Sequence, residues 1–293
     1  MSRSRPAGWI VLALGLGILP AFASARAGAG PADEPARRLC RAAREGRLDV
    51  VQAILREYPE SVRGADQFEY TALHWASLCG QTPVVKILLD AGAAIEARGG
   101  QEGRTALGLS ALRGREDILR ALLARGASVN ARDGLGRTAV HAACEGGQAR
   151  VLEILIGNGG SVDVPDKEGL TPLHLACQAG SESAARLLID HGAAVDPAAG
   201  TGETPLHLAA WSGYGRLVEL LLERGARLDS ADSGGATALI RASRCGQVAV
   251  VRLLIAAGAD AGIRDATGRT AADYARLFAF KDLLSVLDLK RGT

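Results

Sequence analysis

Histidine recurs in this sequence at a fixed distance from threonine, and histidine can ligate metals or move protons near neutral pH. Four of the five His stand three residues after a Thr: His74, His141, His174 and His207. The hexapeptide Thr-Pro-Leu-His-Leu-Ala even occurs twice, at 171–176 and 204–209. A side chain that returns together with its neighbours belongs to a repeated element. That element must be defined before any chemistry is assigned.

The repeat is about 33 residues long, and a threonine marks each copy. Its positions are Thr71, Thr105, Thr138, Thr171, Thr204, Thr237 and Thr270, with one step of 34 and the others of 33. In the first six copies a glycine stands nine residues after the Thr and another stands 21 residues after it. A degenerate earlier copy includes Leu39. The chain therefore contains about eight units, from about residue 35 to its end.

Each conserved position of the repeat has a mechanical reason. A Thr hydroxyl caps free amide groups at a helix start, and Pro172 fits the first helical position, where a missing N–H costs nothing. The first Gly ends a short helix, and a second short helix follows with an apolar pair such as Leu221-Leu222. Asp-x-x-Gly then forms a tight turn. Such short helices are unstable alone, so the units must stack into a solenoid.

The period, with Thr-Pro-Leu-His-x-Ala and a Gly after the second helix, closely resembles the ankyrin repeat. The resemblance implies an all-α solenoid of about eight stacked helix-turn-helix units with projecting β-turn loops. It also implies a concave inner face, made of loop tips and first helices, that binds other proteins without catalysis. The expected units lie near 36–67, 68–100, 101–134, 135–167, 168–200, 201–233, 234–266 and 267–293.

In such a stack we do not expect the recurring His to form a metal site. Equivalent positions in neighbouring units lie about 10 Å apart, whereas zinc needs nitrogens near 2 Å from one centre. The resemblance implies instead that each His ties its turn to the adjacent unit. We therefore expect no metal and no cofactor.

The five Cys are expected to be packing residues and not disulfide partners. Cys144 and Cys177 fill the same slot of neighbouring units, too far apart for a disulfide. Cys79 and Cys245 fall in a slot that ankyrin proteins often expose, so they are the better candidates for reactive thiols.

The sequence does not favour an enzyme. It contains no Gly-x-Ser-x-Gly, His-Glu-x-x-His or phosphate-loop motif, and the repeats occupy all of the folded length. The net charge of +2, with mixed charges on the expected concave face, argues against a duplex nucleic acid or a membrane surface as partner.

The position of a residue within the repeat predicts whether stacking needs its side chain. Side chains that stacking does not need are free to contact a protein partner. Two clusters are prominent: Phe68, Tyr70 and Arg104 on successive loops, and Trp211, Tyr214 and Arg244 near one helix end. Phe68 and Tyr70 could equally well cover the N-terminal unit instead of binding a partner. The expected binding residues are Phe68, Tyr70, Arg104, Arg113, Arg137, Glu145, Lys167, Gln178, Glu203, Trp211, Tyr214 and Arg244.

The first residues differ from the repeats. Arg3 and Arg5, a short apolar run and Ala23-Ser24-Ala25 form the pattern of a secretory signal peptide over residues 1–25, although an uncleaved anchor is an alternative. Residues 26–35 are rich in Ala, Gly and Pro and are interpreted as a flexible linker, followed by the repeat domain at 36–293.

Together these features predict an exported protein of bacterial type, periplasmic or secreted. It binds an unidentified protein partner as a non-catalytic scaffold, and its capped ends favour a monomer. The alternative keeps the fold and makes the chain a secreted effector or toxin-associated factor acting on another cell.

Overall fold

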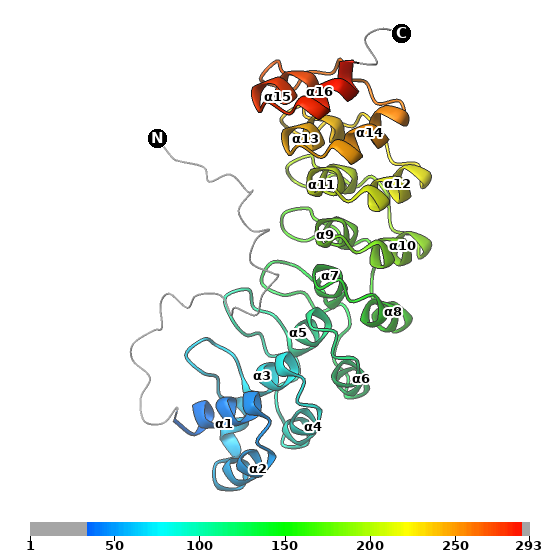
Figure 1. Ribbon diagram of the computed structural model, residues 1–293. Helices are drawn as coiled ribbons and strands as arrows, with labels where there is room; N and C mark the ends of the chain where they lie inside the picture. Colours follow the sequence, from blue (N-terminus) through cyan, green and yellow to red (C-terminus); the bar gives the residue numbers. More distant parts are fainter. Residues whose placement is uncertain (1–33, 289–293) are drawn as a thin grey trace.

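A computed structural model describes residues 34–288, and this part of the chain forms eight pairs of antiparallel helices stacked into one elongated solenoid (Figure 1). The first helices of the pairs are α1 (Glu34–Glu45), α3 (Ala72–Cys79), α5 (Ala106–Leu112), α7 (Ala139–Glu145), α9 (Pro172–Ala179), α11 (Pro205–Ser212), α13 (Ala238–Arg244) and α15 (Ala271–Leu277). The second helices are α2 (Leu48–Glu57), α4 (Thr82–Asp90), α6 (Glu116–Ala124), α8 (Ala149–Gly157), α10 (Glu182–Asp190), α12 (Gly215–Glu223), α14 (Val248–Ala256) and α16 (Lys281–Asp288). A short 3-10 helix, η3 (Pro59–Arg63), follows α2.

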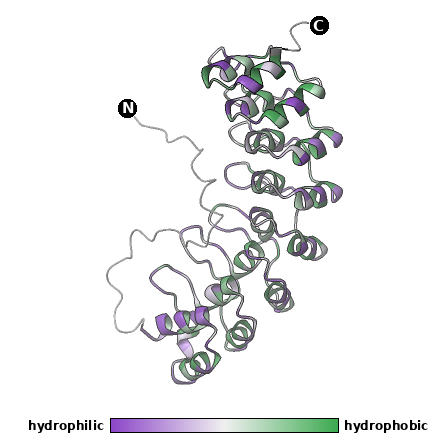
Figure 2. Cartoon of the chain, in the orientation of Figure 1, coloured by the Kyte–Doolittle hydropathy of each residue, from purple (hydrophilic) through white to green (hydrophobic). Residues whose placement is uncertain are grey.

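The two sets of helices form two rows, with the hairpin loops projecting beyond the row of first helices (Figure 1). Each first helix packs on the first helices before and after it, and each second helix packs likewise within its own row. Leu and Val side chains between the rows, such as Leu155, Leu188 and Leu221, are completely buried. Every helix carries both hydrophobic and hydrophilic residues (Figure 2), so burial of the apolar faces between rows and between repeats holds the stack together.

The recurring threonines cap the first helices, as expected from the sequence. Thr71 has an extended backbone, and its side chain accepts a hydrogen bond from the His74 amide. In the same capping box the His74 ring accepts from the Thr71 amide. Thr270 forms the equivalent box with Asp273, which replaces the histidine in the last repeat. The threonine therefore fixes where the first helices from α3 to α15 begin.

The glycine that ends each first helix also makes room for the next repeat. Gly180 has a φ of +75°, and a Cβ added there would lie 2.6 Å from the Tyr214 ring of the following unit. The equivalent neighbours are Gln247 above Gly213 and, in the last unit, Phe280 above Gly246. The residue after this glycine, or after Ala279 in the last unit, therefore covers the preceding repeat.

Hydrogen bonds join successive hairpin loops near their tips. The amide of Lys167 donates to Leu135 O, and the amide of Ser233 donates to Thr201 O, both at 2.9 Å. Within a loop, the Asp133 carboxylate accepts from the amides of Leu135 and Arg137, which closes the expected Asp-x-x-Gly turn. The loops thus form a continuous, bonded edge of the solenoid.

The eight units and the all-α class were predicted correctly, but the predicted end of the linker is wrong. Helix α1 already begins at Glu34, so residues 34 and 35 belong to the repeat domain. The predicted signal peptide and the rest of the linker lie outside the described residues. Across residues 34–288, every helix is too short or too polar to cross a bilayer.

Candidate protein-binding face

The recurring histidines join adjacent repeats. His141 Nδ1 lies 3.1 Å from the Thr138 amide nitrogen, which can only donate, so Nδ1 accepts and Nε2 carries the proton. Nε2 then donates to Leu170 O in the next repeat, at 3.3 Å. The same arrangement connects His74 to Ala97 O and Arg104 O, His174 to Glu203 O, and His207 to Ala236 O. The predicted structural role of these side chains is confirmed.

Burial keeps these imidazoles neutral. Desolvation is the largest influence on each of the four, and it lowers the pKa of His141 to about 4. Hydrogen bonds from the rings to backbone carbonyls oppose that shift without cancelling it. Both nitrogens of His141 are engaged within the protein, and residues 34–288 hold no group of three or more potential metal ligands.

Arg104 is buried, which contradicts the expectation that its side chain is free. Only 7% of the residue is exposed. Its Nε lies 2.5 Å from Glu102 Oε2, and its Nη2 lies 2.9 Å from Glu145 Oε2 in the next repeat. Burial disfavours the charge, but the carboxylates of Glu145 and Glu102 outweigh burial and raise the pKa of Arg104.

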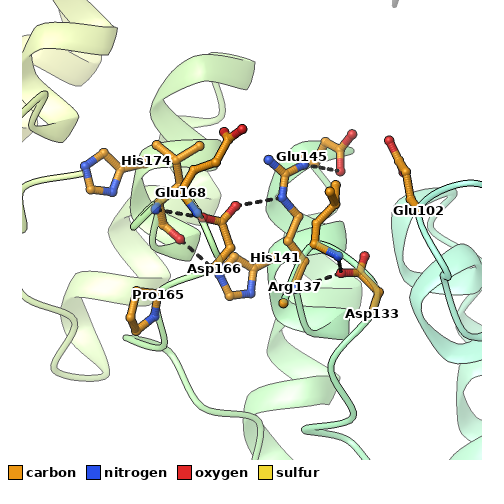
Figure 3. A network of polar contacts seen from close by, with 12 residues as sticks. Glu102, Asp133, Arg137, His141, Glu145, Pro165, Asp166, Glu168 and His174 are labelled. Atoms are coloured by element: carbon orange, nitrogen blue, oxygen red, sulfur yellow. Dashed lines mark hydrogen bonds and ion pairs between the residues drawn. The ribbon is translucent and has the colours of Figure 1, made fainter. Parts of the chain in front are cut away.

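Arg137 continues this network to the following hairpin loop (Figure 3). Its Nε lies 2.9 Å from Asp166 Oδ2, and its Nη1 lies 3.7 Å from Glu145 Oε2. Glu145 therefore faces two arginines, and Arg137 faces two carboxylates. The expectation that stacking does not need Arg104, Arg137 and Glu145 is wrong, because their ion pairs join three successive hairpin loops.

A second network lies around Trp211 in the C-terminal half. Arg241 places its Nε 2.8 Å from Asp232 Oδ2 and its Nη2 2.9 Å from Glu203 Oε1. Its guanidinium also lies 5.7 Å from the centre of the Trp211 ring, and that of Arg244 lies 5.9 Å from the same ring. Glu203 is thus another predicted binding residue that is already paired, whereas Arg244 remains exposed.

At the N-terminal end, aromatic side chains support the first repeats. The Tyr70 ring lies 5.8 Å from His74 and 5.2 Å from Trp75, and an added Cβ at Gly100 would clash with it. Trp75 Nε1 donates to Asp66 Oδ2 at 2.7 Å. These contacts favour the structural interpretation of Tyr70, and Phe68 nearby is half-buried against the same core.

The remaining predicted residues have mixed roles. Arg113 is exposed and Gln178 is half-buried. Lys167 is exposed, but its Nζ donates to Gly134 O at 2.6 Å. The Tyr214 ring covers Gly180 of the preceding repeat while 37% of the residue stays exposed, and its binding role stays a prediction.

Arg241, Tyr274 and Leu277 lie on the first helices beside the predicted residues, and the sequence-based prediction did not single them out. Arg241 and Tyr274 occupy the slot four residues after the repeat Thr, where the other repeats have Trp75, Leu109, Ala142, Leu175 and Leu208. This change from an apolar to a polar residue was the available signal. Leu277 and Phe278 end α15, where 58% and 49% of each residue is exposed.

All five cysteines are free thiols, and Cys144 and Cys177 are completely buried. Desolvation raises the pKa of Cys79 and Cys245, which are only half-buried, while neighbouring arginines oppose that rise. Their predicted reactivity stays a prediction, and a raised pKa argues against it.

These helix pairs begin at threonine caps, are joined by histidines and have hydrogen-bonded hairpin loops, and together they define a repeat solenoid. The chain belongs to the ankyrin repeat family: the family described as "Ankyrin repeats (3 copies)" matches residues 39–133, 130–199 and 194–265. Ankyrin repeats generally serve as protein–protein interaction scaffolds, and the fold is typically non-catalytic.

Among solved structures, the human ASB11 ankyrin repeat domain is similar, with a TM-score of 0.69 and 28% identity. The similarity covers 75% of this chain and 98% of that one. Two curated proteins of Schizosaccharomyces pombe (strain 972 / ATCC 24843) share a shorter stretch, covering 20% of this chain in each case. BTB/POZ domain-containing protein 3 is 48% identical over 58 residues, and Palmitoyltransferase akr1 is 42% identical over 59. This chain spans 11% and 9% of their lengths.

Proposed function

We propose that this chain is a non-catalytic scaffold that binds a protein partner on the face formed by its first helices and hairpin loops. The supporting observation is the change in the slot seven residues after each repeat Thr. That slot holds Leu78, Leu112, Glu145, Gln178, Trp211, Arg244 and Leu277, whose exposure ranges from half-buried to exposed. The stacking positions keep their character from repeat to repeat, so the members of this variable row other than the paired Glu145 can specify a ligand.

The proposal predicts that a partner contacts one row of helices and not the other. A photo-crosslinking residue would replace Gln178 on α9 in one sample and the exposed Arg252 on α14 in the matched control. In extracts of the source cells, we expect specific protein adducts from position 178 and none from position 252. Equal labelling from both positions, or no adduct from position 178, would contradict the proposal.

We also propose that the chain acts outside the cytoplasm, periplasmic or secreted. The support is the sequence pattern of residues 1–25, with two arginines, an apolar run and Ala23-Ser24-Ala25. Cell fractionation with mass spectrometry of the mature N-terminus tests this, and we expect a chain that starts near Arg26. Recovery of the full-length chain from the cytoplasm would overturn the proposal. Recovery from the medium and not from the periplasm would favour the effector alternative.

A further inference from the structure

Aromatic and arginine side chains alternate along the first helices of the last three repeats. The guanidinium of Arg244 lies 5.9 Å from the centre of the Trp211 ring on α11 and 5.3 Å from that of the Tyr274 ring on α15. The Tyr274 ring in turn stacks on Phe278, with centroids 6.3 Å apart and planes at 16°. We call Trp211, Arg244, Tyr274, Leu277 and Phe278 the C-terminal patch.

Arg244 differs from Arg104, Arg137 and Arg241 because no carboxylate pairs with it in the described part of the chain. Arg104, Arg137 and Arg241 each face two carboxylates. Arg244 is exposed, and its guanidinium lies over the Trp211 and Tyr274 rings. Contact with two rings favours a guanidinium that stays over them, and the exposed edge of that group is open to a ligand.

The carboxylates beneath the patch are occupied. Asp232 is buried and binds Arg241. Burial acts to raise the pKa of Asp265, but hydrogen bonds from the Thr267 and Tyr274 hydroxyls and from backbone amides outweigh burial and lower that pKa to about 2. Both carboxylates thus lie inside the protein, and Arg244 presents its charge to solvent, as does Arg269, whose guanidinium lies 5.9 Å from the Tyr274 ring.

Two exposed apolar residues lie in the repeat that follows Arg244. Leu277 and Phe278 end α15 with about half of each residue exposed, and Phe278 lies 5.9 Å from Phe280, measured between ring centroids. Of the large hydrophobic residues between 34 and 288, the other exposed one is Tyr214, which covers Gly180. Adjacent exposed apolar side chains and an unpaired guanidinium are the features of a peptide-binding anchor.

We propose that the C-terminal patch binds a segment of the partner protein in which an acidic side chain stands close to an apolar one. The carboxylate would accept two N–H groups of Arg244, a geometry that a planar guanidinium favours, and the apolar side chain would cover Leu277 and Phe278. This inference rests on the proposed scaffold function and specifies the chemistry of its partner. Single-stranded nucleic acid fits less well, because guanidinium groups lie over the Trp211 and Tyr274 rings, where bases would stack.

The test uses two fluorescein-labelled peptides that share the same leucines, one with glutamates between them and one with glutamines. In fluorescence anisotropy with the full chain, we expect the Glu peptide to bind about tenfold more tightly than the Gln peptide. Raising the salt to about 0.5 M NaCl should reduce that difference, since the attraction is electrostatic.

Three variants locate the site. Arg244→Gln should weaken binding of the Glu peptide about tenfold, and Leu277→Ser should weaken binding of both peptides. Arg252→Gln, which removes an exposed arginine on α14, should change neither. Because these side chains are exposed, the circular dichroism spectra should match the parent chain.

Equal affinities for the two peptides, an unchanged affinity of Arg244→Gln, or no binding of the Glu peptide would overturn the inference. Displacement of the Glu peptide by poly(U) at the same site would assign the patch to nucleic acid and also overturn it. If crosslinking from position 178 still captures a protein while the Glu peptide fails to bind, the scaffold function stands and the acidic-segment inference alone is wrong.

Discussion

At the residue scale, the buried histidines connect the fold to pH. The pKa of His141 is lowered by burial to about 4 in the folded chain, against about 6.5 in an unfolded one. A group with a depressed folded pKa stabilises the protein above its unfolded pKa, and that contribution is lost as the pH falls. Between pH 7 and pH 5, His141 alone should reduce the free energy of unfolding by about 2 kcal/mol. Denaturant unfolding across that range measures the loss.

Two variants separate this effect from general acid sensitivity. His141→Gln should lower stability at pH 7 but reduce its fall toward pH 5, because no buried imidazole remains to be protonated there. His191→Gln is the matched control, since His191 is exposed and its Nδ1 donates to Leu187 O at the end of its own helix. An unchanged pH dependence in His141→Gln would show that the histidine is not responsible.

Arg104 offers a second prediction at this scale. The side chain is buried and holds Glu102 and Glu145, so Arg104→Ala removes a buried pair and leaves Glu145 with Arg137 alone. We expect a loss of about 1–3 kcal/mol in unfolding free energy, the lower value reflecting the partial exposure of both carboxylates. Arg113→Ala, at an exposed position of the same repeat, should change stability by less than about 0.5 kcal/mol. Similar values for the two variants in urea unfolding would show that the Arg104 network does not stabilise the stack.

At the scale of the elements, the hairpin loops depend on close backbone approach between repeats. Gly202 has a φ of +75°, and a Cβ there would lie 2.7 Å from the backbone nitrogen of Ser233, the group that donates to Thr201 O. Gly202→Ala therefore adds a clash with backbone to the conformational strain, and we expect it to cost about 2–3 kcal/mol.

Gly225 provides the comparison. Its φ of +86° is similar, but an added Cβ meets nothing within 4 Å. Gly225→Ala should show the strain alone, about 1–2 kcal/mol. Thermal unfolding of both variants decides the point: equal losses would mean that contact between loops adds nothing to the strain of a left-handed residue.

The elements also show how far sequence reasoning reaches. Threonine caps, terminal glycines and histidine bonds could be predicted because each recurs with the 33-residue period and acts within a repeat or on its neighbour. The pairing of Arg104 with Glu145 could not, because the partners are 41 residues apart and meet only after stacking fixes the rotamers of both. Position in the repeat indicates which side of the solenoid a side chain occupies. Whether it is free there depends on the charges of the adjacent repeats.

At the scale of the whole molecule, each repeat contacts only its neighbours, so position along the stack should decide what a core defect does. Leu152 on α8 and Leu283 on α16 are both completely buried, and replacing either with Ala should cost about 2–5 kcal/mol locally. In Leu283→Ala we expect the last repeat to open by itself, because within residues 34–288 it packs on a repeat on one side only. Hydrogen exchange should then increase in α15 and α16 while the central helices stay protected.

Leu152→Ala should behave differently, because the repeats on both sides lose a shared interface when α8 opens. We expect faster exchange to extend into α6 and α10 and the two halves of the solenoid to unfold separately in urea. Faster exchange along the entire chain in both variants would show instead that the eight repeats unfold as one unit. A defect at α16 would then unfold all eight repeats and not the last one alone.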